Sequence, residues 1–478
     1  MKKIHLMLII TAGILLISSV TAGWIHLYIS QQTLPDHVQV GGWDVGGKKK
    51  DNVLKELDDR LKQLEQQPLT LSLAAKGVPD AAMTLKEAGV TFEADDFRSS
   101  VAGLYEGNWL ERFKARQYFK TDWQLSPHWN RSVLKQRFDS SWEEKHFGEP
   151  VNASRRITKD DRVAYTPEIS VYRIDWETFT DTMTTLIPKR FLSPEEAAAP
   201  LKAKLPIYML KPEVTVSSLR EEGIDRKIIE FNTGLGSSAA GRIYNVNSAA
   251  KAMDGMLLKP GDIFDYGKVI ARAEAKYGFR EAPVIVNGKL VPGIGGGICQ
   301  VSSTIYNAAL RTGLEIVERR NHSLPVSYLP KGLDATFAEG SINFRFKNTT
   351  GKSLYIRAFV DGSTLTVKFF GTFPKNTEYL VESRTVETLP VPDKFVQNKA
   401  IPAGAQEVLQ EGKPGYIVET YQIKKVNGAV VERKRISRDT YRAQNRLIAV
   451  NSGREDSGND SSGSKDQIVE DGISGPQF

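Results

Sequence analysis

Residues 284–337 read VIVNGKLVPGIGGGICQVSSTIYNAALRTGLEIVERRNHSLPVSYLPKGLDATF, and their glycines and apolar residues predict the local fold. Apolar segments flank Asn287-Gly288, a pair typical of a two-residue hairpin turn because both residues tolerate positive φ. After a glycine run, apolar residues recur at helical spacing from about Cys299 until Gly313, which is a typical helix stop. The pattern predicts an α+β domain in which a cysteine-bearing helix packs on an antiparallel sheet.

Cys299 is the only cysteine of the chain, so it has no disulfide partner within it. At the start of a helix, free amide N–H groups and the helix dipole favour a thiolate. The preceding glycines allow a sharp turn and a close backbone approach, and they would supply oxyanion donors. We therefore take Gly295, Gly296, Gly297 and Gln300 as candidate ligand-binding residues.

His322 and Asp334 follow Cys299 in the order that a thiol enzyme needs: nucleophile, base and orienting carboxylate. Transglutaminase-like and NlpC-like thiol enzymes use this order, although the 23-residue interval from Cys299 to His322 is shorter than in those families. Arg319 and Arg320 beside the histidine are candidate anion-binding residues.

The alternative is a structural Cys299, since buried cysteines often act as small hydrophobic residues. Under that interpretation the glycine run packs the helix against the sheet, and Asp334 caps a turn. A metal held by Cys299 and His322 would need two more ligands that the sequence does not place. No phosphate-binding GK[ST] and no HExxH zinc motif occurs in the sequence, so no metal or cofactor is expected.

The amino-terminal run Ile4–Ile29 is apolar and follows Lys2 and Lys3. As a helix its 26 residues span about 39 Å, enough for a bilayer core of about 30 Å. The leading positive charges favour a cytoplasmic amino terminus and an extracytoplasmic remainder. A signal peptide cleaved after Ala22 is the alternative, but the run is longer than a typical signal core.

Composition excludes several classes of protein. The 478 residues contain 40% hydrophobic and 25% charged residues, which excludes a largely disordered, collagen-like or many-span membrane protein. The net charge is +7, with −4 in residues 451–478 and +11 in the rest. A basic body favours an anionic partner, namely a wall polymer, a lipid surface or nucleic acid. The expected extracytoplasmic location argues against nucleic acid.

Residues 231–371 resemble the VanW family through FNTGLG, LLKPGDIFDY, PGIGGGICQVSSTIYNAAL, RRNHSLPVSYLPKGLDATF and LYIRAFVDGSTLTVKFFG. The resemblance implies a Gram-positive cell envelope and a context of vancomycin resistance, but no specific activity. These residues carry a net charge of +7, which suits an acidic glycan or teichoic polymer.

Two further resemblances flank this domain. VQVGGWDVGGKKKDNVLKELDDRL near the amino terminus is similar to a peptidoglycan-binding module found outside Gram-positive membranes. EVLQEGKPGYIVETYQIKKVNGAVVERKRIS resembles the five-glycine (G-five) domain, which implies an elongated all-β module and suggests binding of N-acetylglucosamine. In both cases a spacer without a ligand is the alternative, because a fold does not establish a function.

The sequence thus predicts an α+β multidomain protein. Its expected parts are a transmembrane signal-anchor (1–30), a peptidoglycan-binding α+β region (31–200), a linker (201–230), the VanW domain (231–371), the five-glycine β domain (379–453) and a disordered tail (454–478).

We expect a single-pass, membrane-anchored envelope protein that binds peptidoglycan or an anionic wall polymer and supports cell-wall metabolism or the glycopeptide response. The alternative is a thiol-dependent peptidase or transpeptidase that acts on peptidoglycan stem peptides, with Cys299 as nucleophile, His322 as base and Asp334 as orienting group.

Overall fold

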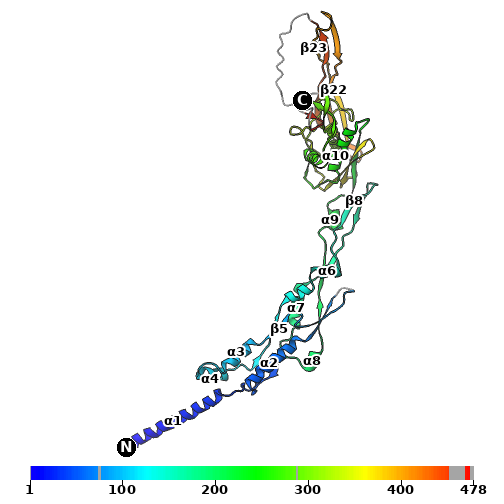
Figure 1. The fold of residues 1–478 in the computed structure, drawn as a ribbon. Helices are drawn as coiled ribbons and strands as arrows, with labels where there is room; N and C mark the ends of the chain where they lie inside the picture. Colours follow the sequence, from blue (N-terminus) through cyan, green and yellow to red (C-terminus); the bar gives the residue numbers. More distant parts are fainter. Residues whose placement is uncertain (1, 74–76, 287–288, 452–468, 474–478) are drawn as a thin grey trace. The chain divides into compact units, whose positions relative to one another are not determined.

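The computed structural model describes residues 2–73, 77–286, 289–451 and 469–473 (Figure 1). The chain divides into two compact units. The first contains the residues up to 152 and residues 168–213, and the second contains residues 153–167 and those from 214 onward. Mixed helices and strands, an apolar amino-terminal helix and a β-rich carboxyl-terminal region are all present, as the sequence predicted.

The first unit combines short strands with helices. Its helices are α1 (Lys2–Ile29), α2 (Lys50–Glu65), α3 (Asp95–Gly103), α4 (Trp109–Gln117), α5 (Arg131–Arg137), α6 (Ser140–Phe147), α7 (Trp176–Leu186) and α8 (Pro194–Ala198). Its strands are β1 (Gln39–Val40), β2 (Trp43–Asp44), β3 (Pro68–Leu73), β4 (Ala81–Thr84), β5 (Val90–Glu93), β6 (Asp122–Trp123), β7 (Ser126–Trp129), β10 (Val171–Ile174), β11 (Leu201–Leu205) and β12 (Ile207–Leu210).

Among the described residues, α1 is the one helix long and apolar enough to cross a membrane. Its carboxyl-terminal end is tied to α4, because Arg112 Nη2 donates to the carbonyl of Ile29 at 2.6 Å. The ring of Tyr28 packs edge-on against Phe113 and lies under the guanidinium of Arg116. The end of the helix is thereby joined to the domain that follows it.

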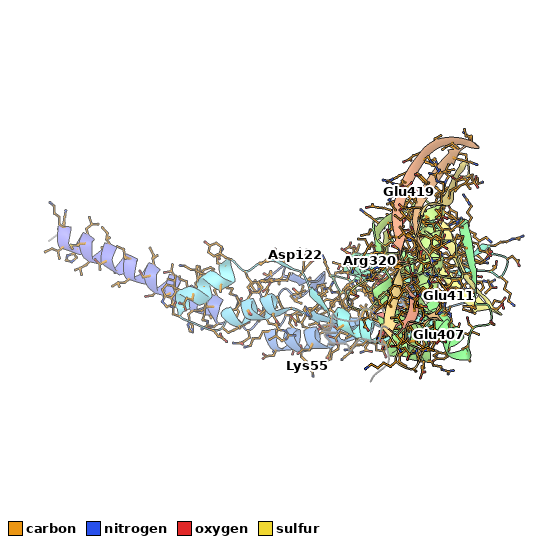
Figure 2. All side chains as sticks on the ribbon, turned by 90° about the horizontal axis from the view of Figure 1, so that it is seen from above. Lys55, Asp122, Arg320, Glu407, Glu411 and Glu419 are labelled. Atoms are coloured by element: carbon orange, nitrogen blue, oxygen red, sulfur yellow. The ribbon has the colours of Figure 1, made fainter. Side chains whose placement is uncertain are left out.

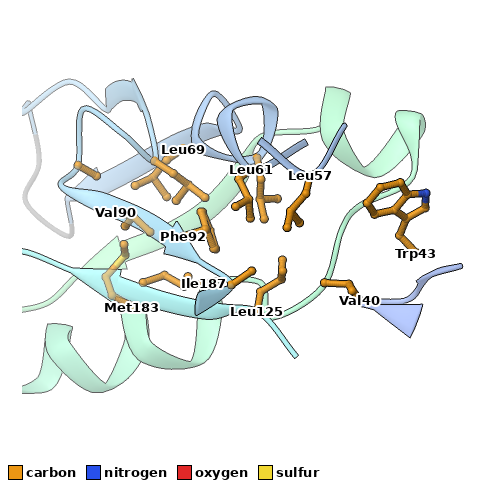
Figure 3. Packing of buried hydrophobic residues seen from close by; sticks show 14 of the residues in the cluster. Val40, Trp43, Leu57, Leu61, Leu69, Val90, Phe92, Leu125, Met183 and Ile187 are labelled. Atoms are coloured by element: carbon orange, nitrogen blue, oxygen red, sulfur yellow. The ribbon is translucent and has the colours of Figure 1, made fainter. Parts of the chain in front are cut away.

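Apolar side chains at helical and strand spacing form the core of the first unit (Figure 3). Leu57 and Leu61 of α2 and Leu69 of β3 belong to this core, and Phe92 and Ile187 join them from other elements. Strand β3 pairs in parallel with β11 and antiparallel with β4.

The expected linker over residues 201–230 is instead structured. Strands β11 and β12 lie on either side of Pro206, and Ala203 and Leu205 of β11 are buried. The alternation in Leu201–Leu205 carries a strand signal that the prolines of this segment obscured.

The second unit contains α9 (Val216–Glu221), α10 (Ala240–Met253), α11 (Tyr266–Tyr277) and α12 (Ile298–Arg311). Its strands up to residue 371 are β8 (Ser154–Ile157), β9 (Val163–Thr166), β13 (Arg226–Gly234), β14 (Leu257–Leu258), β15 (Ile263–Asp265), β16 (Glu281–Val286), β17 (Lys289–Ile294), β18 (Glu315–Glu318), β19 (Arg345–Lys347), β20 (Leu354–Asp361) and β21 (Thr364–Gly371). Those after it are β22 (Thr377–Leu389), β23 (Asp393–Gln397), β24 (Gln406–Gln410), β25 (Gly415–Val426), β26 (Ala429–Tyr441), β27 (Arg446–Val450) and β28 (Val469–Glu470).

An antiparallel four-stranded sheet, ordered β13-β21-β20-β14, underlies the cysteine-bearing helix. Helix α12 contacts β13 and β21, and α10 contacts β20 and α12. Nearly every residue of α12 is buried, Cys299 and Gln300 included. Strands β16 and β17 form the expected hairpin, whose turn residues Asn287 and Gly288 lie outside the described residues.

After residue 371 the second unit is almost entirely strand. Long strands form the sheet β22-β25-β26, and shorter ones form β23-β27-β24. Asn427, with φ +52°, and Gly428 make the turn between β25 and β26 that the sequence predicted.

The sequence predicts a disordered tail over residues 454–478, but part of this segment is structured. Within the described residues 469–473, β28 pairs antiparallel with β16, and Asp471 and Gly472 are buried. Residues 454–468 and 474–478 of the predicted tail lie outside the described residues. The sequence did not predict β28 because this strand forms by backbone pairing with a distant strand. Such pairing leaves little local signal in a polar sequence.

Candidate functional site

The glycine run before α12 is a tightly packed turn. Gly295 and Gly297 have φ of +88° and +104°, a region that disfavours other residues. A Cβ on Gly296 would lie 2.4 Å from the carbonyl oxygen of Pro283. Asn245 of α10 fixes the turn, because its Nδ2 donates to the carbonyl of Gly296 at 3.0 Å. The turn thus presents the first amide groups of α12 in a defined direction.

Cys299 occupies the first turn of α12 and is fully buried. Its sulfur accepts the N–H of Phe337 at 3.1 Å and donates to the carbonyl of the same residue at 3.4 Å. The thiol therefore contacts the backbone of Phe337, which follows Asp334 closely in the sequence. These contacts suit a packing role, and the N–H group also provides a donor for a thiolate.

The amide groups at the start of α12 bind a carboxylate from the far end of the chain. Asp471 Oδ1 accepts the N–H of Gly297 at 3.2 Å and that of Cys299 at 2.9 Å. Arg242 of α10 donates through Nη1 to Asp471 Oδ2 at 3.1 Å. Burial acts to lower the pKa of Arg242, but the charge of Asp471 and its hydrogen bond outweigh burial and raise that pKa. The start of α12 is thus capped by the Asp471 carboxylate, which is also paired with Arg242.

Gln300 positions the arginine of this site. Its Oε1 accepts from Arg242 Nη2 at 3.1 Å, and its Nε2 donates to the carbonyl of Gly234 at 2.8 Å and to Thr233 Oγ1 at 3.1 Å. Because both ends of the amide are bonded, Gln300 connects α10 to strand β13 through α12.

His322 and Asp334, which the sequence pairs, are in direct contact. Asp334 Oδ2 lies 2.7 Å from His322 Nδ1 and accepts the backbone N–H of His322 at 2.7 Å, while its other oxygen accepts the hydroxyl of Tyr441. Burial acts to raise the pKa of Asp334, but hydrogen bonds and charge from His322, helped by Arg319, lower it to about 2. The carboxylate is therefore ionised and holds the imidazole in place, which is the task of an orienting group.

The structure separates the two predicted anion-binding arginines. Arg319 is buried and forms ion pairs with Asp439 at 2.6 Å and Asp334 at 3.6 Å, so its charge is used within the chain. Arg320 has an exposed side chain, which is labelled in Figure 2. Neither arginine is among the described residues that line the pocket below.

A pocket of about 780 Å³ lies beside the start of α12. One wall comes from residues 234–331, including Arg242, Gln300 and Tyr328. The opposite wall comes from residues 413–444, and Asp471 reaches the pocket from the carboxyl-terminal segment. Its charged lining residues are Arg242, Lys331, Lys413, Arg442 and Asp471, and its aromatic ones are Tyr328 and Tyr416. Cations outnumber the single carboxylate, so the pocket favours an anionic ligand.

The sequence alone does not mark Arg242, Asp471 or Tyr441 as members of the site. Each acts on a residue far along the chain, and no local motif marks such a contact. One signal was present for the carboxyl-terminal segment: the apolar Val469 and Ile473 interrupt an otherwise polar stretch. Among the described residues, no group of three or more His, Cys, Asp or Glu side chains could hold a metal ion.

Comparisons with known proteins identify two domains within the second unit. Residues 241–370 match the family model described as VanW like protein, and residues 381–452 match the G5 domain. The uncharacterized protein YoaR of Bacillus subtilis is 31% identical over 236 residues, which cover 49% of this chain and 74% of that protein. The vancomycin B-type resistance protein VanW of Enterococcus faecalis is 28% identical over 151 residues, 30% of this chain and 55% of that protein.

One solved structure, described as HP0197-G5, matches with 32% sequence identity and a TM-score of 0.12. The match covers 15% of this chain and 97% of that one. The relatives and family models confirm the resemblance that the sequence motifs carry. The chain therefore belongs to the VanW-like family, with a G5 domain on the carboxyl-terminal side of its VanW-like region.

Proposed function

We propose that this chain is a membrane-anchored, extracytoplasmic protein of the cell envelope that binds peptidoglycan or an anionic wall polymer. The observation that carries the proposal is the pocket between the VanW-like region and the G5 domain. Lys331, Lys413 and Arg442 place positive charge in its lining, and Tyr328 and Tyr416 add rings with polar ends. A concave site of this size with a few fixed polar groups suits a ligand of several sugar or amino-acid units.

The location part of the proposal rests on α1. This helix is exposed over nearly its whole length, as expected for a segment whose apolar surface faces lipid. Lys2 and Lys3 precede the apolar run, which favours a cytoplasmic amino terminus. Because the apolar run is longer than a typical signal core, we favour a retained anchor over a signal peptide cleaved after Ala22.

Two further features support wall binding. The residues after α1 resemble a peptidoglycan-binding module and would provide a second contact with the wall. The G5 domain adds a third, because the five-glycine family is suspected of binding N-acetylglucosamine. Support for cell-wall metabolism or the glycopeptide response is the role that we propose for a protein held there, in keeping with the name of its relative VanW.

Cosedimentation with purified sacculi tests the proposal. The full chain in detergent micelles is expected to pellet with sacculi at 0.15 M salt and to be released as salt rises towards 1 M, because the Debye length falls from about 8 Å to about 3 Å. Failure to pellet at any salt concentration would overturn the proposal.

A thiol-dependent peptidase or transpeptidase is the second candidate. The observation that favours it is that the N–H groups of Gly297 and Cys299 converge on one oxygen atom, at 3.2 and 2.9 Å. This is the arrangement by which oxyanion holes stabilise a tetrahedral intermediate. The ionised Asp334 beside His322 supplies the orienting pair that such a mechanism needs.

In that mechanism the Cys299 thiolate would bond to a carbonyl carbon of a stem peptide while the amine leaves with a proton from the His322 imidazolium. Water or an amine of a second stem would then take the acyl group and free the thiol. Mass spectrometry of muropeptides incubated with wild type and Cys299→Ser tests it. A product made by wild type alone supports the enzyme, and identical profiles from folded, wall-bound proteins exclude it for these substrates.

A further inference from the structure

The amide groups at the start of α12 bind Asp471, a residue from a distant part of the chain. Asp471 lies 172 residues after Cys299, and its carboxylate uses both oxygens. One oxygen accepts the N–H groups of Gly297 and Cys299, and the other accepts a proton of the Arg242 guanidinium. Two amides and a guanidinium thus supply hydrogen-bond donors to both oxygens of the carboxylate.

The segment that carries Asp471 is seated in the manner of a bound peptide. Strand β28 pairs antiparallel with β16, with Glu470 opposite Ile285. The N–H of Ile473 donates to the carbonyl of Ile294 at 2.8 Å. A Cβ on Gly472 would lie 2.3 Å from Val284 Cγ1, so the segment fits closely at this position. Addition of an extended segment to the edge of a sheet is a common mode of peptide recognition.

The site also has room beyond the carboxylate. Asp471 and Arg242 both line the pocket of about 780 Å³, whose other wall holds Lys413 and Arg442. A ligand that replaced the Asp471 carboxylate could therefore extend into a cationic space.

We propose that the amides of Gly297 and Cys299, with Arg242, form a binding site for the free carboxylate of a peptide, and that Asp471 is an internal occupant that competes for it. The fit of an aspartate side chain shows that the donors accept two oxygens at carboxylate spacing. Asp471 has φ +61°, in the left-handed region that aspartate adopts more readily than most non-glycine residues. The inference rests on the proposed wall binding for the source of the ligand, since stem peptides of peptidoglycan end in carboxylates.

Fluorescence anisotropy on the full chain in detergent micelles tests the proposal. The probe is fluorescein-labelled Gly-Ala-Ala with a free terminal carboxylate, and the same peptide as its amide is the matched probe control. The proteins are wild type, Asp471→Asn, Asp471→Ala and the double variant Asp471→Ala/Arg242→Gln. Glu339→Ala, which removes an exposed acid of the same unit, is the protein control.

Both Asp471 variants are expected to bind the acid probe at least tenfold more tightly than wild type or Glu339→Ala, with no such gain for the amide. Adding Arg242→Gln should reverse the gain. Equal affinities in wild type and folded Asp471 variants, or equal binding of acid and amide, would overturn the proposal. Sacculus pelleting of the same samples distinguishes failure of the carboxylate site from failure of the wall-binding function. If the proteins still pellet but do not bind the probe, only the carboxylate site is refuted. If wild type does not pellet, the wall-binding function is refuted.

Discussion

Arg319 and Asp439 form an ion pair 2.6 Å long that joins the VanW-like region to the G5 domain. Both side chains are buried, and Arg319 also donates to the carbonyl of Asp334 at 2.7 Å. Tyr441 of the G5 domain donates its hydroxyl to the Asp334 carboxylate, which holds His322. The candidate histidine is therefore positioned by residues of both domains.

Arg319→Ala should destabilise the second unit by about 3–5 kcal/mol, because it leaves the carboxylates of Asp334 and Asp439 buried without their cation. Arg320→Ala is the matched control, since its side chain is exposed, and its effect should stay within about 0.5 kcal/mol. Urea denaturation followed by tryptophan fluorescence and far-ultraviolet circular dichroism measures both. Equal effects of the two substitutions would contradict the role given to Arg319.

The stability of the second unit should fall in acid as Asp334 is protonated. The folded-state pKa of about 2 lies below the ordinary value of 3.8, so the contribution is present above about pH 4 and is lost as pH falls towards 2. The lost contribution is on the order of 2 kcal/mol. Unfolding free energies measured at intervals between pH 5 and pH 2 should show this slope in wild type and a weaker one in Asp334→Asn. The same slope in both proteins would assign the acid sensitivity to other carboxylates.

Gly297→Ala should destabilise the chain by about 2 kcal/mol or more, because φ is +104° and a Cβ would lie 2.8 Å from Cγ of Arg242. Gly234→Ala is the comparison, since a Cβ there would meet nothing within 4 Å. The melting temperatures of the two variants, measured by calorimetry, should therefore differ clearly. A Gly297→Ala protein as stable as Gly234→Ala would show that the turn can relax.

Cys299 provides a built-in reporter of the site, because it is the only thiol in the chain. Asp471→Ala should raise its rate of alkylation by iodoacetamide about tenfold, since the change frees the amides at the start of α12 and removes a negative charge from the same helix end. Mass spectrometry of time points measures the rate, with Glu339→Ala as the control. Unchanged rates would mean that Asp471 does not control the reactivity of the thiol.

Much of the local structure followed from the sequence. The glycine run, the helix from Ile298 and the turn at Asn427-Gly428 were predictable because their signals lie within a few residues. The sequence also paired His322 with Asp334, and the structure places them in contact.

The partners of that site were not predictable in the same way. Asp471 reaches Cys299 across 172 residues and Tyr441 reaches Asp334 across 107, distances at which periodicity and turn chemistry carry no information. Arg319 looked like a ligand-binding residue because charged side chains are usually exposed. Its burial depends on Asp439, which lies in another domain.

The pocket between the two domains is the proposed wall-binding site, and the double variant Lys413→Gln/Arg442→Gln tests that role. Both residues line the pocket with exposed side chains, so their replacement should leave the unfolding free energy within about 0.5 kcal/mol of wild type. The measurement is the fraction of full-length protein that pellets with sacculi at 0.15 M salt, with Lys394→Gln/Lys399→Gln, on another part of the G5 domain, as the charge-matched control. The double pocket variant should pellet several-fold less than wild type and the control. Equal pelleting of all three proteins would contradict the claim.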